Sequence, residues 1–490
     1  MKFTRALSLL LAALMLTGTL ASCATENHDE GDTAPEGATT VSEEDTVPKD
    51  NLPDGLNYGG ETVTFYTNTP ITYANLSGDP VSDAVFERNK YVESRLNLKI
   101  ESIEDKSNDP YLVVNKTVNA VKSGSTDYDV IVSPCWVVLD QSISGTFANL
   151  AGADYIQLDQ PWWTQGFNEA VSFQGNQYAV VGSVLLSIYR STFATVFNKN
   201  LFNDANQPFP YEYVEQGTWT LDKQASLIPL FHRDNGNNTQ DATGDYYGLT
   251  TGLISYVDPY WASCEVDIMG RNSEGEYELV FNSGRLYDAA EKVLHLYYGT
   301  DGGTYIIDAV TDSPSNLFSN GYSAMATVLI SALETAEMRN MEDAYGVVPI
   351  ARLTEEQDGY YSPLGDGAFV IAAPTTTTGE KLDRLGAVLE AMGSASYRII
   401  KPAYYETTLR TKLVSDPQSS EMLDLIIENI RIDAGYIYVT AFESFHHGFR
   451  DIIASGVNST TSLYSSKLKL TEKKVKSLNV KLARLAEKNG

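Results

Sequence analysis

The feature of this sequence that most constrains its fold is an alternation of short apolar runs with amphipathic stretches. Residues 62–66, 98–100 and 129–132 have the composition of strands, and residues 81–96 and 111–122 have helical spacing of apolar side chains. A β-α-β-α-β order of this kind places parallel strands beside one another and packs the connecting helices on the sheet. The sequence therefore predicts an α/β protein.

The same alternation returns late in the chain. Residues 323–326, 346–349 and 368–371 are predicted strands, and residues 329–341 are a predicted helix. Further helices are expected over residues 380–392, 421–432 and 470–488. The stretch from Tyr155 to Tyr298 is richer in aromatic residues and helices, and no fixed-period repeat is present, which disfavours a solenoid or a propeller.

The length of the chain favours more than one hydrophobic core. Of its 490 residues, those from 57 to 490 form the predicted folded body, which exceeds what one core usually organises. We expect two interleaved α/β lobes there. No cofactor and no metal site is predicted.

The N-terminus has the features of a secretory leader. Lys2 and Arg5 precede an almost wholly apolar run from Ala6 to Leu16, which is too short to span a bilayer. The run ends in Leu20-Ala21-Ser22-Cys23, which resembles a bacterial lipobox. That resemblance implies a leader over residues 1–22 and a lipid on Cys23. The alternative is an ordinary cleaved leader followed by an incidental cysteine.

Residues 23–56 are predicted to form the lipidated cysteine and a disordered linker, because the segment from Ala24 to about Leu56 has almost no large apolar side chains. The predicted location is the extracellular face of the cell membrane, with attachment by lipid. Two cysteines remain, Cys135 and Cys264. They could pair, but two separate buried thiols are the favoured interpretation.

The charge of the chain excludes one class of partner. It carries 35 basic and 64 acidic residues, a formal net charge of -29. Nucleic acid binding needs basic patches that neutralise phosphates, so no nucleic acid partner is expected. An acidic surface says nothing about the identity of a small ligand.

Seven segments of the body resemble, in order, the extracellular solute-binding proteins (family 1) of ABC importers, and in particular the carbohydrate-type lipoproteins of Gram-positive bacteria. The segments are residues 83–89, 128–131, 159–163, 196–202, 217–222, 318–325 and 402–409. Each is weakly specific alone, and their order after a lipobox carries the likeness. It implies a two-lobed periplasmic-binding-protein fold of the type II kind, with a hinge and a ligand cleft between the lobes. It also implies permease subunits as partners and a monomeric binder of a small molecule, with sugars and oligosaccharides as the expected ligand classes.

Candidate ligand residues follow two predicted strands of the first lobe. Tyr66 and Asn68 follow the first strand, and Ser133 and Trp136 follow the strand at residues 129–132. Ligands of open α/β sheets bind beyond the carboxyl ends of strands, so both loops are expected to face the cleft. Tyr66 and Trp136 could stack on a sugar ring, and Asn68 and Ser133 could bond hydroxyls. Trp136 could equally pack between helices.

Two further candidates come from the resemblance. Trp261, in Asp258-Pro259-Tyr260-Trp261, lies where related proteins often place an aromatic platform. Asp366 stands in a Gly-rich turn where the family often has an aromatic residue, and it could bond two hydroxyls, pair with a cationic ligand or satisfy its own turn. Trp162, Trp163 and Trp219 are expected to pack within the lobes.

Other functions stay open at this point. A lipid-anchored glycoside hydrolase would need two carboxylates across a cleft, but no nucleophile or cofactor motif is present and we do not expect an enzyme. A surface glycan-docking lipoprotein without a transporter is a second alternative. Peptides, polyols and cationic solutes remain alternative ligands. The loop from Asp234 fits a Ca²⁺ site poorly, since Thr239 stands at its sixth position.

Overall fold

A four-stranded sheet forms the first of the two larger sheets. The computed structural model of the protein describes residues 48–107, 109–237, 239–242, 244–307, 312–365, 367–409 and 417–489. The strands are β1 (Glu61–Thr67), β2 (Leu98–Glu104), β3 (Val130–Pro134) and β12 (Phe369–Ala372), in the order β12-β3-β1-β2. β1 is parallel to β2 and β3, and β12 is antiparallel to β3. The predicted parallel β-α-β-α-β unit is confirmed.

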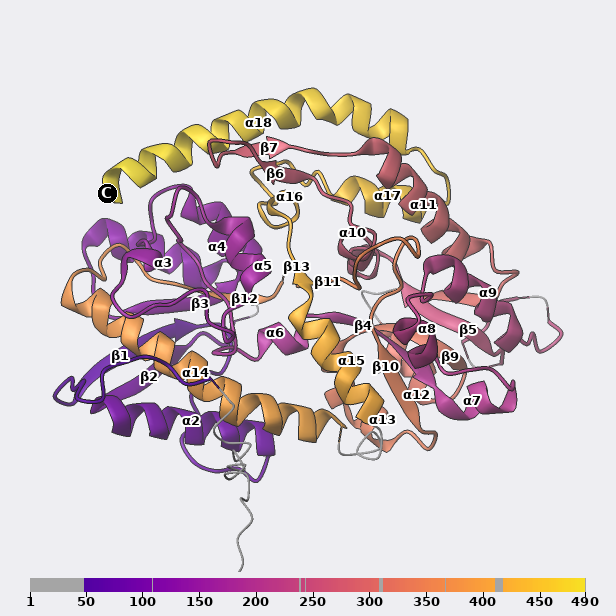
Figure 1. Cartoon of the computed structure of the whole chain (residues 1–490), viewed down its shortest axis with the longest axis horizontal. Coiled ribbons are helices and arrows are strands. Elements are labelled where there is room, and N and C mark those ends of the chain that lie inside the picture. Colours follow the sequence, from indigo (N-terminus) through magenta and orange to yellow (C-terminus); the bar gives the residue numbers. More distant parts are fainter. Residues whose placement is uncertain are drawn as a thin grey trace, which may run out of the picture. The chain divides into compact units, whose positions relative to one another are not determined.

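Helix α2 (Pro80–Leu96) shows how the local sequence sets these elements. Asp79 caps it by accepting a hydrogen bond from the Ser82 amide, and Pro80 occupies its first turn. Asn97 ends it in the left-handed conformation, with φ 48°. The buried side includes Val81, Val85, Val92 and Leu96. α3 (Leu112–Ser123) and α4 (Cys135–Ser142) pack on β3, and α2 lies against the long α14 (Glu380–Leu409), as Figure 1 shows.

A five-stranded sheet forms the second region. Its order is β10-β4-β9-β5-β8. The strands are β4 (Phe193–Asn198), β5 (Tyr247–Gly252), β8 (Thr304–Ile307), β9 (Ser323–Leu329) and β10 (Tyr345–Val348). β5 is parallel to β8 and β9, whereas β4 is antiparallel to β9 and β10. Every residue of β4 and β5 is buried, which explains their continuous apolar and small-residue sequences.

Helices surround the second sheet. They are α7 (Lys199–Asp204), α8 (Pro210–Glu215), α9 (Leu221–Phe231), α10 (Pro259–Ser263), α11 (Ser283–Tyr298), α12 (Pro314–Ser319), α13 (Ala336–Asn340) and α15 (Pro417–Glu428). Three-residue to five-residue 3₁₀ helices lie at Leu150–Gly152, Ile254–Tyr256 and Ile330–Glu334. The helix predicted over residues 329–341 is therefore two short pieces.

The chain passes between the two sheets several times. After β3 it forms α5 (Gln165–Val171) and α6 (Ser187–Arg190) before entering β4, and after β10 it returns to the first sheet as β12 and α14. α15 then contacts β10 of the second sheet. Each sheet thus uses segments that are far apart in sequence.

Short strands and the C-terminal helices complete the body. β6 (Met269–Arg271) and β7 (Tyr277–Leu279) form a hairpin, and β11 (Ser362–Pro363) pairs with β13 (Ile430–Arg431). α16 (Ala434–Ile437), α17 (His447–Ser455) and α18 (Thr460–Asn489) follow. The helix predicted over residues 421–432 was wrong at its end, because α15 stops at Glu428 and the chain extends to pair with β11. α18 begins ten residues before the predicted Leu470 and packs on β7, α11 and α17.

The folded unit begins before Asn57, where the linker was expected to end. Residues from Pro48 onward belong to one compact unit. Asp50 forms an ion pair with Arg95 at 2.5 Å, and the Leu52 side chain is buried in the core. The linker prediction is corrected for residues 48–56, while Cys23 and the leader lie outside the described residues.

Other predictions are confirmed. Trp162, Trp163 and Trp219 are buried in the core, and Cys135 and Cys264 are two separate buried thiols that do not form a disulfide with each other. Within the described ranges, no helix is both long and apolar enough to cross a membrane.

Candidate ligand-binding site

The carboxyl ends of β1 and β3 bring two of the predicted ligand residues together. The Ser133 hydroxyl donates to Asn68 Oδ1 at 2.9 Å, and the Asn68 amide donates to the Val132 carbonyl at 3.2 Å. The parallel pairing of the strands explains this proximity. The Ser133 hydroxyl and the Asn68 Oδ1 are thus already bonded to each other within the protein.

The two predicted aromatic platforms beside them are packed against their own chain. Tyr66 is 4% exposed, its hydroxyl donates to Asp105 at 2.9 Å, and its ring lies 5.0 Å from that of Tyr128. Trp136 is half-buried and meets Tyr111 edge to face at 4.9 Å. Tyr66 therefore has a structural role here, and Trp136 keeps only part of its surface free.

Trp261 lies elsewhere, in α10. It is 5% exposed, and its ring meets those of Phe449 at 5.5 Å and Tyr464 at 6.5 Å, edge to face. Its Nε1 has no hydrogen-bond partner among the described residues. Trp261 lines a small chamber together with Asp267, Arg431 and Asp433. Asp366 lies outside the described residues.

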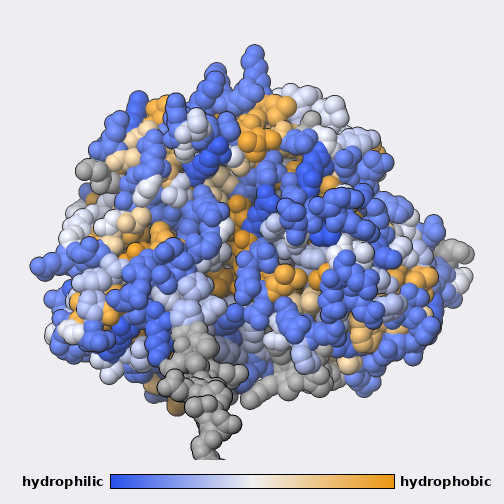
Figure 2. Space-filling view, in the orientation of Figure 1, coloured by the Kyte–Doolittle hydropathy of each residue, from blue (hydrophilic) through white to orange (hydrophobic). Residues whose placement is uncertain are grey.

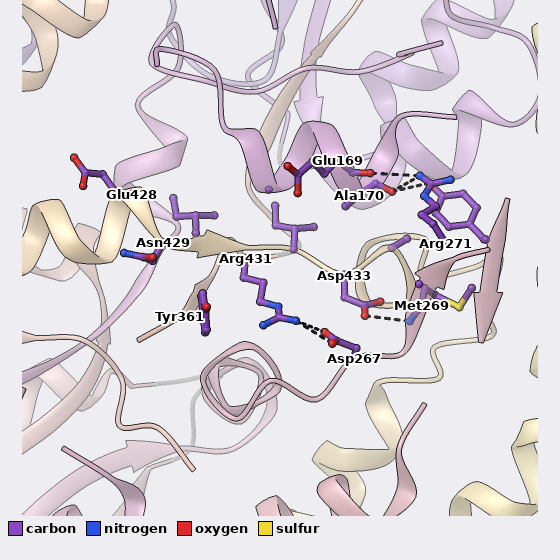
Figure 3. A pocket seen from close by; sticks show the side chains of 16 residues that line it. Glu169, Ala170, Asp267, Met269, Arg271, Tyr361, Glu428, Asn429, Arg431 and Asp433 are labelled. Atoms are coloured by element: carbon purple, nitrogen blue, oxygen red, sulfur yellow. Dashed lines mark hydrogen bonds and ion pairs between the residues drawn. The ribbon is translucent and has the colours of Figure 1, made fainter. Parts of the chain in front are cut away.

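A larger cavity, called here the central cavity, adjoins this chamber. This central cavity has a volume of about 480 Å³ and is bounded by α5, the β6–β7 hairpin, Tyr361 and the segment from Glu428 to Ala434 (Figure 3). Figure 2 shows a mainly hydrophilic face with hydrophobic residues in a recess near its centre. Sequence analysis did not single out any of the residues that line the central cavity.

The β6–β7 hairpin is set by a tight turn. Asn272 Oδ1 accepts hydrogen bonds from the amides of Glu274 at 3.0 Å and Glu276 at 2.9 Å, and Gly275 has φ 76°, which favours glycine. The turn holds Arg271 over the ring of Tyr277, at 3.7 Å. Arg271 donates to the backbone carbonyls of Ala170 and Ser172, so it ties the hairpin to α5.

Arg431 is positioned by the pairing of β13 with β11. That register places it beside Tyr361, and its guanidinium lies 5.0 Å from the ring centre. Its Nη2 donates to both carboxylate oxygens of Asp267, at 2.8 and 2.9 Å (Figure 3). The two side chains are 32% and 43% exposed, so solvent still reaches the pair. Tyr361 thus offers an aromatic surface next to a fixed cation and a fixed carboxylate.

Asp433 closes the same wall of the cavity. It accepts hydrogen bonds from the amides of Ile268 at 2.7 Å and Met269 at 3.1 Å, and it caps α16 through the Gly435 amide at 2.6 Å. Burial raises the pKa of this carboxyl to about 6, against the lowering effect of these amides. Asp433 holds the hairpin, β13 and α16 in one arrangement.

Two carboxylates that line the cavity have no partner. Glu169, on α5, and Glu428, at the end of α15, are exposed, and neither side chain forms a hydrogen bond or an ion pair within the described part of the chain. Carboxylates beside a guanidinium and a tyrosine ring can accept hydrogen bonds from hydroxyl or amino groups of a ligand. The arrangement suits a polar, multiply hydroxylated molecule.

The central cavity continues at both ends. It shares Asp267, Arg431 and Asp433 with the Trp261 chamber. It shares Gly166, Glu428 and Ile430 with a cavity of about 290 Å³ beside Trp162 and Trp163. The Trp163 indole donates to the buried Glu390 at 3.0 Å, which fixes that wall. The central cavity therefore has two neighbouring cavities that are lined in part by the same residues.

Comparison with known proteins identifies the fold. No protein-family model and no curated protein matches the sequence. An ABC substrate-binding protein of Listeria monocytogenes in complex with cycloalternan is 15% identical with a TM-score of 0.52, over 86% of this chain and 99% of that one. UgpB of Mycobacterium tuberculosis in complex with glycerophosphocholine is 17% identical with a TM-score of 0.51, over 86% and 98%. A sugar transporter protein of Rhizobium etli in an open conformation is 17% identical with a TM-score of 0.50, over 85% and 99%. The chain has the two-lobed α/β fold of ABC solute-binding proteins.

Proposed function

We propose that this protein is the substrate-binding component of an ABC importer and that it captures a sugar or an oligosaccharide. The observation that carries the proposal is the polar central cavity, which is lined by charged side chains and by the rings of Tyr277 and Tyr361, in a fold shared with ABC solute-binding proteins. Sugars are recognised by carboxylates and guanidinium groups that bond hydroxyls and by aromatic rings that cover the ring faces. No step of covalent chemistry is needed.

In this proposal Arg431, Asp267, Glu169 and Glu428 contact ligand hydroxyls, and Tyr361 covers a ring face in the central cavity. A ligand in the central cavity contacts α5, the β6–β7 hairpin and β13 at the same time, and so adds to the hydrogen bonds by which Arg271 already joins the hairpin to α5. The Asn68–Ser133 pair is a second candidate contact.

We further propose that the mature protein is held at the extracellular face of the membrane by lipid on Cys23 and passes its ligand to permease subunits. The support is the lipobox-like Leu20-Ala21-Ser22-Cys23 after an apolar run. Metabolic labelling with a radioactive or alkyne fatty acid tests this part. Label in the natural chain that is lost in Cys23→Ser is expected, and an unlabelled natural chain would overturn the anchor.

Thermal unfolding of the purified chain in the presence of candidate ligands tests the binding function. The panel contains mono- and oligosaccharides, glycerophosphocholine, peptides and polyamines. A ligand at a hundred times its dissociation constant adds about 2.7 kcal/mol and raises the melting temperature by a few degrees. A shift within one glycan series is expected. A shift with peptides or polyamines alone would overturn the sugar assignment.

A further inference from the structure

A second, smaller cavity lies next to the carboxyl end of β1. It has a volume of about 100 Å³ and lies between α2, the loop 69–71, the segment 184–191 that includes α6, and the first residue of β12. It shares no lining residue with the central cavity or with either of its extensions. We call it the Arg88 cavity.

Arg88 is a buried arginine whose hydrogen-bond partners are all uncharged. It is 1% exposed, and its hydrogen bonds go to neutral groups: Nε to Asn89 Oδ1 at 2.7 Å, and Nη1 to the Ser396 hydroxyl at 2.7 Å and the Val184 carbonyl at 3.1 Å. Nη2 makes no hydrogen bond with any described residue. The two N–H donors of Nη2 are therefore unused, and Arg88 is one of the residues that line the cavity.

The other charges of the cavity do not balance Arg88. Among its lining residues, Arg88 and Arg190 are the charged ones, and no acidic side chain lines it although the chain carries 64 acids. Arg190 is already paired, since its Nε and Nη2 donate to Glu334 at 2.9 and 2.8 Å. The cavity therefore has an excess of one positive charge.

Several other arginines of the described body have a charged or aromatic partner. The buried Arg384 pairs with Glu61, and the partly buried Arg450 and Arg95 pair with Asp258 and Asp50. Arg352 has no carboxylate, but its terminal nitrogens donate to three backbone carbonyls and its guanidinium lies 4.9 Å from the ring centre of Tyr360. A buried charge without such compensation is costly. Burial alone lowers the pKa of Arg88 to about 9, and no opposing charge offsets it.

We propose that the Arg88 cavity binds a small carboxylate, with the carboxylate oxygens accepting from Nη2 of Arg88. The size of the cavity agrees with this, because about 100 Å³ is the space of three or so water molecules and suits an ion of three or four heavy atoms. Formate and acetate have these dimensions. The Thr69 and Ser191 side chains also line the cavity and can meet the second oxygen.

Calorimetric titration of the purified full chain with sodium formate and sodium acetate tests this site, with sodium chloride and phosphate as comparisons. We expect saturable binding of one carboxylate per chain. Arg88→Met should weaken it by about tenfold or more, since it removes the charged donor. Arg398→Met is the matched control: it removes a cation of α14 that donates to the Ser394 carbonyl and does not line the cavity.

Two results would overturn the proposal. One is the absence of saturable binding at about 50 mM formate or acetate, far above a millimolar dissociation constant. The other is tighter binding of chloride or phosphate than of either carboxylate. If Arg88→Met fails to fold, crystals of the natural chain grown in formate decide: density for water alone beside Nη2 contradicts the site. Glycan binding is measured on the same variants, and because the cavities share no residue, either function can fail without the other.

Discussion

The carboxyl ends of β1 and β3 and the central cavity are both places where a ligand could bind, but they differ in how their polar groups are satisfied. At the strand ends, Ser133 donates to Asn68 and Tyr66 donates to Asp105. In the central cavity, the Glu169 and Glu428 carboxylates have no partner among the described residues. A ligand gains most where polar groups are not already bonded within the protein, because it displaces only water. This difference favours the central cavity.

Tryptophan replacement should give the largest contrast between the two regions. Trp261→Ala leaves a void beside Phe449 and Tyr464, and we expect it to lower the free energy of unfolding by about 3–5 kcal/mol. Trp136→Ala removes a half-buried ring at the strand ends and should cost about half as much. Urea denaturation measures both. Trp261→Phe keeps most of the packing, and equal losses for the two alanine variants would contradict the difference in burial.

The pH dependence of stability should also differ between the Trp163 wall, which is supported by a buried carboxyl group, and the ends of β1 and β3. Burial raises the pKa of Glu390, which supports the Trp163 wall, to about 7, against an ordinary 4.5. Folding then takes up a proton between these values, so this group lowers stability as pH rises from about 4.5 to about 7.

Glu390→Gln removes that dependence. We expect the variant to gain about 2–3 kcal/mol relative to the natural chain between pH 5 and pH 8. Urea denaturation at a series of pH values measures it. Ser133→Ala at the strand ends serves as control, because it removes no titratable group, and a parallel pH profile for Glu390→Gln and the natural chain would contradict the assignment.

Removing the Asp267 carboxylate, which pairs with Arg431, should weaken ligand binding more than it lowers stability. Asp267→Asn breaks a partly exposed ion pair, so its cost in stability is at most about 1 kcal/mol. Affinity for the glycan found in the thermal screen should fall about tenfold, because Arg431 loses its fixed position. Isothermal titration measures affinity. Asp222→Asn, which breaks the ion pair with Lys292 away from the cavity, is the matched control, and equal affinities for both variants would remove Arg431 from the site.

The smallest effect is expected at the strand ends. Ser133→Ala loses one hydrogen bond to Asn68, which costs about 1 kcal/mol in stability. Glycan affinity should change by about twofold or less if the central cavity holds the ligand. A loss of binding in this variant would instead place the ligand at the carboxyl ends of β1 and β3, where the sequence analysis predicted it.

The secondary structure and fold class could be read from local patterns. The predicted strand at residues 62–66 and helix at residues 81–96 agree with β1 and α2, because alternation, a capping Asp79 and Pro80 act within a few residues. The C-terminal end of α15 could not be predicted from the local sequence pattern. Residues 429–432 continue the helical spacing, but the pairing of Ile430 with Ser362 draws them into β13.

The sequence by itself determined the alternating α/β architecture and the burial of Trp162, Trp163 and Trp219, because local propensity and side-chain hydrophobicity specify these features. Only the tertiary structure decided which polar groups face a cavity. Asp267, Tyr361 and Arg431 come from three separate segments and meet through strand pairing and a hairpin turn. Arg88 appears in the sequence as one polar residue of an amphipathic helix, and its burial without a carboxylate depends on Val184 and Ser396 from distant segments. Long-range packing sets these contacts, and no short pattern records it.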